Sequence, residues 1–541
     1  MTLRGPDSGG LLGAAVAGWI ATSPSLLPRT WWMWTADIGI SQACGYAAGA
    51  VVRRALRAAG RALGCRAPAL PRTAAVAVLS GISALSWVRG VLRQQEISRL
   101  VEEEPKPLRT HLLGTAAGVA ASAAALATVR GVLGAARLYR DGMRRRMAPR
   151  GMRSLADVLA VALLVLVLDR AVRHRVLARA LEHAERTNRL LQPDLSRPTT
   201  PLRSGGPGSG EDWAALGAAG RRIVSGGPSR SEIAAATDAP AREPIRVYAG
   251  KTGGRTLSEA VAAVVAELER TGAFRRRVVV LATGTGTGWL QEWSLSSIEY
   301  LTGGDCATAS LQYSVTTSAL GYLLDRTTPQ RAGAMLFTAV RRRLAELPPD
   351  RRPQLYVTGE SLGSFGGQAA FRDAADMLAS IDGAVWTGTP GFTPIHRELT
   401  ARRRPGSPQI APVIDAGRHI RFVACPTELR GTSCAPWQHP RVVYAQHASD
   451  PVVWWGPQML WRRPEWLRER AGRDVTGAMR WFPWITFWQI AADMPLSIAA
   501  RSGHGHAYRE EMLPIWAAVL GIPLEESRRL RLTAAIRAGA E

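Results

Sequence analysis

The sequence predicts an all-α, membrane-spanning first part followed by an α/β domain with a mostly parallel sheet and helices on both faces. Two observations lead to this prediction. Apolar stretches of about 20 residues recur in the first third, and from Ile245 onward short β-branched runs alternate with helical patterns. The chain has 541 residues, more than one ordinary core accommodates. We therefore expect a helical domain over 1–190, a flexible Gly-, Pro- and Ser-rich linker over 191–212 and the α/β domain over 213–541.

Five apolar segments approach the length of a bilayer span. They cover residues 10–28, 34–52, 73–92, 110–130 and 154–172. Each is near the ~20 residues that cross ~30 Å of hydrocarbon as a helix. Glycines within them allow close contact between helices in lipid. Buried helices of a soluble bundle are the alternative interpretation.

The formal net charge of +25 comes almost entirely from arginines, many of which flank the apolar segments. This placement indicates a lipid bilayer as partner and not nucleic acid, since no basic stripe with interleaved aromatic residues is present. Loops 53–72 and 131–153 are rich in arginine, which places the amino terminus inside the cell. After five crossings the α/β domain lies outside, although the basic stretch 170–189 argues against this. We expect a multi-pass protein of the cell membrane; no pattern predicts its oligomeric state.

The cysteines predict no metal site and no disulfide scaffold. There are five of them, without the paired spacing of zinc ligands. Cys425 and Cys434 could close one small loop or remain unpaired thiols. We expect no cofactor.

The predicted sheet rests on alternating elements in the second part. We expect strands over 245–249, 277–282, 309–315, 354–358, 384–388, 420–423 and 442–446. Helices are expected over 256–271 and 330–347.

Ser361 is the strongest nucleophile candidate. It occupies the centre of Gly359-Glu360-Ser361-Leu362-Gly363, between an apolar strand and a helical pattern. A serine on such a tight turn is exposed to substrate, and glycines at the flanking positions avoid collisions. A glycine-rich turn that only closes the strand is the alternative.

A serine hydroxyl needs a base, and the base needs an orienting carboxylate. Asp450 follows the strand 442–446, at the sheet edge where functional groups gather, so it is the predicted acid. Asp382 and Asp415 are rivals, but Asp382 precedes its strand. A structural role for Asp450 in the turn before Pro451 is the alternative.

The histidine comes from Gly503-His504-Gly505-His506. We prefer His504 as the base, with His506 in a supporting hydrogen bond; the reverse assignment remains open. Metal binding by the two is disfavoured because no third ligand is close in sequence. His439 and His447 are expected to be structural.

An oxyanion hole requires two backbone N–H donors. We assign one to Leu362 and the other to the loop 283–289, at Thr287 or Gly288. The spacing of glycines in this loop is not that of a dinucleotide-binding motif.

With these motifs the chain resembles a known group: actinobacterial membrane proteins that join a multi-span amino-terminal domain to an α/β-hydrolase catalytic domain. The resemblance spans nearly the whole chain. Its carriers are Ser23-Pro24-Ser25-Leu26-Leu27-Pro28-Arg29, Thr285-Gly286-Thr287-Gly288-Trp289, Gly359-Glu360-Ser361-Leu362-Gly363, Gln446-His447-Ala448-Ser449-Asp450-Pro451 with Trp454-Trp455, and Gly503-His504-Gly505-His506-Ala507-Tyr508. It implies a serine-hydrolase fold and a membrane location, and it supplies no defined substrate.

The expected activity is cleavage of an apolar acyl ester or thioester through an acyl-serine intermediate. A membrane acyltransferase would use the same three residues. A non-catalytic membrane accessory protein is the third possibility, but a pure binder has no need of a complete serine, acid and histidine set.

Overall fold

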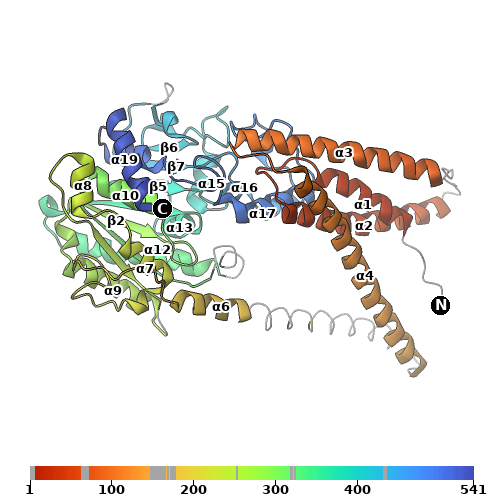
Figure 1. The fold of residues 1–541 in the computed structure, drawn as a ribbon, viewed down its shortest axis with the longest axis horizontal. Helices are drawn as coiled ribbons and strands as arrows, with labels where there is room; N and C mark the ends of the chain where they lie inside the picture. Colours follow the sequence, from red (N-terminus) through yellow and green to blue (C-terminus); the bar gives the residue numbers. More distant parts are fainter. Residues whose placement is uncertain are drawn as a thin grey trace. The chain divides into compact units, whose positions relative to one another are not determined.

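The computed structural model describes residues 7–62, 72–146, 178–251, 254–316, 325–430 and 435–540, with the single residues 166, 170 and 321. The chain divides into two compact units (Figure 1). The helical unit comprises Met1–Arg179 together with Trp455–Ile498, and the sheet unit comprises Ala180–Trp454 together with Ala499–Glu541. The α/β domain expected over 213–541 is therefore interrupted, because its residues 455–498 fold with the amino-terminal helices.

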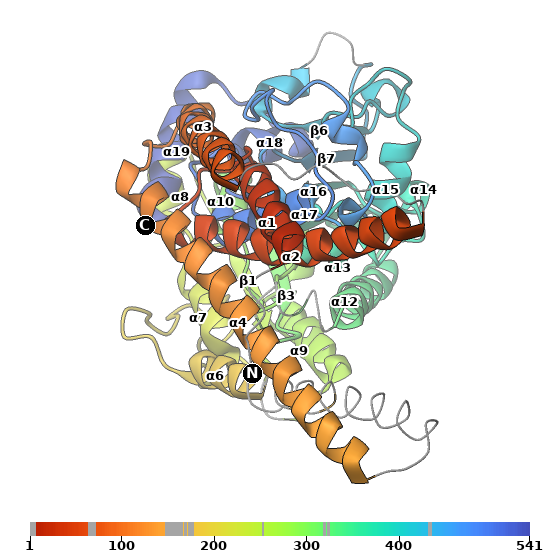
Figure 2. The same cartoon turned by 90° about the vertical axis from the view of Figure 1, so that its right-hand side faces the viewer.

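Within the described residues, the helical unit is built on three long helices, the shorter α1 and a short helix from the inserted segment. They are α1 (Ser8–Ala21), α2 (Trp31–Ala62), α3 (Arg72–Leu100), α4 (Leu108–Arg146) and α17 (Ile485–Ser497). Helices α1 and α2 lie side by side in both views (Figures 1 and 2). A Cβ added at Gly13 would lie 2.1 Å from the carbonyl oxygen of Gly45, so only glycine permits this approach.

Asp493 of α17 attaches the inserted segment to the loop after α1. Its Oδ2 accepts hydrogen bonds from the backbone N–H of Leu26 at 2.9 Å and Leu27 at 3.4 Å, and its Oδ1 accepts from Ser25 Oγ at 3.1 Å. The carboxylate is fully buried. Gln489, one turn earlier, donates to the carbonyl oxygen of Ala21 at 3.2 Å. These bonds explain why a segment far along the chain belongs to the helical unit.

The described residues do not support five spans. Only Leu108–Val132 of α4 is long and apolar enough to cross a membrane by length and composition. Helix α1 has 14 residues, about 21 Å, and ends at Ala21, so the expected segment 10–28 is not one helix. The fifth segment, 154–172, lies almost entirely outside the described residues.

The sheet unit contains one parallel sheet of seven strands in the order β1-β3-β2-β4-β5-β7-β6. The strands are β1 (Ile245–Ala249), β2 (Val278–Thr283), β3 (Cys306–Leu311), β4 (Gln354–Glu360), β5 (Gly383–Thr387), β6 (Ile420–Val423) and β7 (Arg441–Ala445). All seven expected strands are present, and β3 begins three residues earlier than predicted. The mostly parallel α/β architecture is confirmed.

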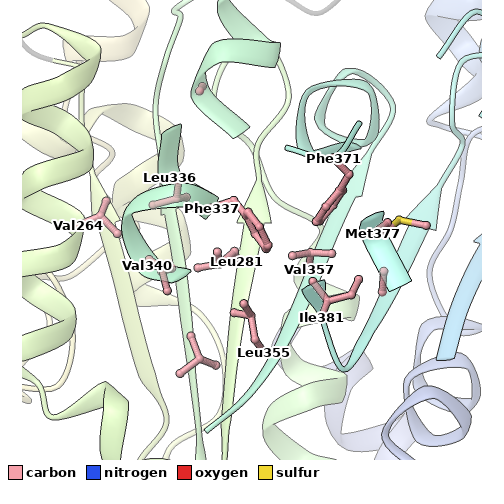
Figure 3. Close-up of a cluster of buried hydrophobic side chains, with 14 of the residues drawn as sticks. Val264, Leu281, Leu336, Phe337, Val340, Leu355, Val357, Phe371, Met377 and Ile381 are labelled. Atoms are coloured by element: carbon pink, nitrogen blue, oxygen red, sulfur yellow. The ribbon is translucent and has the colours of Figure 1, made fainter. Parts of the chain in front are cut away.

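Helices cover both faces of this sheet because alternate strand residues point to opposite sides. The helices are α6 (Ala178–Arg189), α7 (Gly217–Ser225), α8 (Arg230–Thr237), α9 (Leu257–Arg270), α10 (Glu292–Leu301), α12 (Thr327–Ala345), α13 (Leu362–Gln368), α14 (Ala374–Ser380), α15 (Pro394–Ala401), α16 (Pro451–Trp454), α18 (Met512–Leu520) and α19 (Glu526–Ala540). Leu281 and Leu355 pack against α12 on one face, as Figure 3 shows. Val280 and Val443 belong to the core on the other face, with α10 and α18.

The stretch expected to be a flexible linker is ordered and packs on the sheet unit. Ser204 is buried, its backbone N–H donates to the carbonyl of Arg246 in β1 at 3.0 Å, and its hydroxyl donates to Glu267 Oε2 at 3.0 Å. The hydroxyl of Ser209 reaches the same carboxylate oxygen at 2.9 Å. The polar residues that suggested a spacer thus bind a buried carboxylate of α9.

Replacing Asp493 with Ala should weaken the attachment of the inserted segment. Three buried donors lose their acceptor, which lowers the free energy needed to separate the inserted segment from the amino-terminal helices by about 3 kcal/mol. Trypsin should then cleave within Trp455–Ile498 about 100-fold faster, since the cleavage rate follows the fraction of molecules in which this segment is separated. Asp350→Ala, at an exposed position, is the control. An unchanged cleavage rate in Asp493→Ala would contradict the role of this carboxylate.

Candidate active site

Ser361 lies on a strained turn between β4 and α13. Its φ of 54° and ψ of −121° are conformations that non-glycine residues rarely adopt, at a cost of about 1–3 kcal/mol. The backbone N–H of Ser361 donates to the carbonyl of Thr387 in β5 at 3.0 Å. A Cβ at Gly359 would lie 2.5 Å from the backbone of Gly363, and one at Gly363 would lie 2.2 Å from the carbonyl oxygen of Thr283. Both glycines are therefore required for the turn.

Asp450 is buried between the end of β7 and α16. Its Oδ1 accepts the backbone N–H of Val452 at 2.8 Å, and its Oδ2 accepts Nδ1–H of His506 at 2.7 Å and the Tyr508 hydroxyl at 2.7 Å. The two rival carboxylates lie elsewhere. Asp382 accepts a backbone hydrogen bond at the start of β4, and the side chain of Asp415 is 67% exposed.

The histidine that pairs with this carboxylate is His506, so the preference for His504 was wrong. His504 forms the backbone turn that precedes it: its N–H donates to the carbonyl of Arg501, and its carbonyl accepts the N–H of Ala507. The two histidines lie on either side of Gly505 in the sequence, so spacing alone did not separate them. In the structure the imidazole of His506 points toward Asp450.

The hydrogen bonding of His506 leaves one of its two ring nitrogens available. Because Nδ1 donates to Asp450, Nε2 of the neutral ring carries a free electron pair. Nε2 is buried and has no hydrogen-bond partner among the described residues. Burial by itself would lower the pKa of His506, but the charges of Asp450 and Glu360 outweigh it and raise the pKa above its ordinary value.

Two loops far apart in sequence hold Asp450 and His506 together. His447 Nδ1–H donates to the carbonyl of Gly505 at 2.8 Å, and Nε2 of His447 lies 2.7 Å from Glu511 Oε1. Ser449 Oγ accepts the N–H of Gly505 at 2.8 Å. The ring of Tyr508 stacks on His447 with centroids 4.2 Å apart. These contacts agree with the structural role expected for His447. The sequence analysis assigned no role to Ser449, Tyr508 or Glu511.

The structure gives a different outcome for each of the expected oxyanion donors. Leu362 is the first residue of α13, where a backbone N–H has no acceptor within the helix. The N–H of Gly288 donates to the carbonyl of Thr285 at 2.8 Å, so the assignment of Gly288 as a donor was wrong. Thr287, beside it, is partly exposed and donates no backbone hydrogen bond within the described residues. Its assignment stays a prediction.

Glu360 is a functional candidate that sequence reasoning missed. Its side chain is 7% exposed, and its Oε1 lies 3.9 Å from Nε2 of His506. Burial, opposed by His506 and Gln291, raises the pKa of Glu360 to about 7. Glu360, Gln291 and Thr387 line a small cavity with room for about one water molecule.

A metal centre finds no support in the part of the chain that the structure describes, since no three His, Cys, Asp or Glu side chains are grouped to hold an ion. Cys425 forms no disulfide with a described residue, and Cys434 lies outside the described residues, so the possible disulfide between them stays a prediction.

Two protein-family models match the chain. The model of an alpha/beta-hydrolase family matches residues 245–531, which include β1 to β7, Ser361, Asp450 and His506. The model of the amino-terminal part of an alpha/beta-hydrolase family matches residues 22–228. Comparison with curated proteins and with solved structures gives no match.

Adding one methyl group at Gly388 should disable the pair of Asp450 and His506. A Cβ there would lie 2.2 Å from Cε1 of His506 and 3.0 Å from Asp450 Oδ2. Gly388→Ala should therefore displace the imidazole and lower the rate at which Ser361 reacts with a fluorophosphonate by about 100-fold.

Gly406→Ala is the matched control. Gly406 also has a positive φ, of 85°, but a Cβ there meets no atom within 4 Å. This variant introduces the backbone strain without the collision. Ser361 in it should therefore react with the fluorophosphonate at a rate within about two-fold of wild type. Equal rates in both variants would show that His506 does not occupy this position when Ser361 reacts.

Proposed function

Because the chain belongs to the alpha/beta-hydrolase family, we propose that it is a membrane-bound serine hydrolase that cleaves an ester or thioester of an apolar, lipid-like substrate. The observation that carries the proposal is the buried hydrogen bond between Asp450 and His506. It leaves Nε2 of His506 without a hydrogen-bond partner among the described residues, and Glu360, the residue before Ser361, lies 3.9 Å from that nitrogen. A carboxylate that orients a histidine beside a serine on a strained turn supports nucleophilic acyl transfer.

In the first half-reaction Ser361 Oγ attacks the substrate carbonyl carbon while its proton passes to Nε2 of His506. The carbonyl π electrons move onto oxygen, where the N–H groups of Leu362 and Thr287 are the proposed donors. Collapse of this intermediate breaks the bond to the leaving alcohol or thiol, which takes the proton from His506. An acyl-serine remains.

Water completes the second half-reaction. His506 takes a proton from the water as its oxygen attacks the acyl carbon, and then returns that proton to Ser361 as the acid product leaves. Asp450 stabilises the imidazolium in both halves without accepting its proton, and Tyr508 orients Asp450 through its hydroxyl. An alcohol in place of water would give an acyltransferase by the same steps.

The membrane part of the proposal rests on the surface of the helical unit. Helix α4 meets the length and hydropathy of a span, and only 17% of its most apolar window is buried within the protein. Water-exposed leucines and valines at this density are unusual in soluble proteins. Exposed examples on α3 and α4 are Val78, Leu85, Val88, Leu112, Leu113, Val119 and Val129. With the amino terminus inside, the proposed extracytoplasmic placement of the α/β domain requires an odd number of crossings, and the described residues contain one candidate span, Leu108–Val132.

Fluorophosphonate labelling tests the nucleophile. Membranes with the wild-type chain should give a labelled protein whose adduct maps to Ser361, and Ser361→Ala and His506→Ala should reduce labelling by at least about 1,000-fold. His504→Ala should lose less than about 10-fold, because the imidazole that donates to Asp450 is that of His506.

Ser196→Ala, at an exposed position of the ordered stretch before β1, serves as the control and should label like wild type. Labelling that persists in Ser361→Ala would refute the proposal. A chain-length series of nitrophenyl esters with and without an alcohol acceptor then separates hydrolysis from acyl transfer.

Two charges on α4 should weaken membrane attachment. Leu113 and Val119 are 61% and 47% exposed, so Leu113→Arg with Val119→Arg should disfavour insertion by several kcal/mol. Alkaline carbonate extraction should release a larger fraction of this variant than of wild type. Leu530→Arg changes a leucine that is 56% exposed on α19 of the sheet unit and should remain in the membrane pellet. Release of wild type itself would contradict the assignment of a span.

A further inference from the structure

The imidazole of His506 has a carboxylate at each of its two nitrogens. Asp450 Oδ2 lies 2.7 Å from Nδ1, and Glu360 Oε1 lies 3.9 Å from Nε2. Nε2 is the nitrogen that must accept the proton of Ser361 in the proposed mechanism. Glu360 precedes Ser361 in the chain, so the strained turn fixes its backbone as firmly as that of the nucleophile.

The hydrogen-bond partners of Glu360 are too weak to account for this buried carboxylate as a structural group. Its Oε2 is 3.4 Å from the Gln291 side-chain nitrogen and 3.5 Å from the Thr387 hydroxyl, both at the long limit for hydrogen bonds. No arginine or lysine ion pair to it occurs among the described residues. A buried carboxylate with weak partners holds its negative charge poorly, which agrees with the raised pKa of Glu360.

We propose that Glu360 is a positioning residue that shares one proton with His506 and thereby sets the pH range in which His506 accepts the proton of Ser361. The inference rests on the proposed function, because it assigns a role to a carboxyl group beside the base of that mechanism.

The position of the shared proton decides whether Nε2 of His506 can accept the proton of Ser361. With one proton on the pair, the site holds either a neutral Glu360 with a neutral His506 or a carboxylate with an imidazolium. Only the first of these leaves Nε2 free for Ser361. The ionised carboxylate also stabilises the imidazolium that forms when Ser361 attacks, so Glu360 shifts the titration of His506 upward.

Other charged groups lie near the His506 imidazole, and substitutions of Glu360 leave them unchanged. Asp450 accepts Nδ1–H of His506, and the ring of Tyr508 packs edge-on against the imidazole with centroids 5.6 Å apart. His447, paired with Glu511, lies behind Tyr508 and has the opposite influence from the carboxylates. A change confined to Glu360 therefore isolates its own contribution.

The test is the titration of His506 by 15N NMR of the full chain labelled at histidine. The chain has nine histidines, and His506→Gln assigns the signal. In Glu360→Gln, which keeps the shape of the side chain without its charge, the His506 midpoint should fall by about one pH unit. Glu360→Asp should retain most of the wild-type midpoint, and Glu346→Gln, at an exposed helix end, should leave it unchanged.

The wild-type chain supplies a second measurement that needs no substitution. The 13C carboxyl signal of Glu360 should titrate in two steps, one of which coincides with the step of His506. Equal His506 midpoints in wild type and Glu360→Gln, or independent single titrations of the two groups, would overturn the inference.

The rate of fluorophosphonate labelling against pH separates this inference from the proposed function. Its acid limb should move to lower pH in Glu360→Gln by the same amount as the NMR midpoint. A shifted midpoint without any labelling that depends on Ser361 would refute the hydrolase and support the shared proton. Normal labelling with an unshifted acid limb would refute the role of Glu360 and leave the hydrolase intact.

Discussion

The buried carboxylate of Asp450 is the contact on which the candidate site depends. It joins two loops between which the chain leaves the sheet unit, folds as Trp455–Ile498 with the amino-terminal helices, and returns. Loop 503–508 is brought next to loop 447–450 by hydrogen bonds between residues far apart in the sequence. Asp450 and Ser449 accept hydrogen bonds from the returning loop, and His447 donates one to it. Together with Tyr508, they make the position of His506 a property of the tertiary fold.

The segments that carry Asp450 and His506 continue along the chain into the inserted segment of the helical unit. The inserted segment begins five residues after Asp450 and ends eight residues before His506. Within the helical unit, Asp493 and Gln489 bind the loop that carries Ser25 and Leu26. Two parts of the chain that are remote in sequence are each fixed by buried polar bonds. These bonds give a physical reason for the sequence motifs at both places.

Sequence reasoning succeeded where burial alone decides the structure. Parallel strands buried on both faces appear as β-branched runs, so all seven were predicted, and the turn at Ser361 was predicted from its glycines. It failed where long-range polar contacts decide. The fate of 455–498 depends on Asp493, the order of 192–210 depends on a buried Glu267, and the choice of His506 over His504 depends on one backbone turn. The donor role of Gly288 failed because a local turn uses its N–H.

In the proposed mechanism an acyl group passes through Ser361, with His506 as the base. Acid quenching of the protein in membranes within milliseconds of adding a nitrophenyl ester, followed by mass spectrometry of its peptides, tests this most directly. The peptide containing Ser361 should gain the mass of the acyl group, and His506→Gln should abolish this adduct. Ester turnover with an unmodified Ser361 peptide at every quench time, or an adduct on another residue, would contradict it.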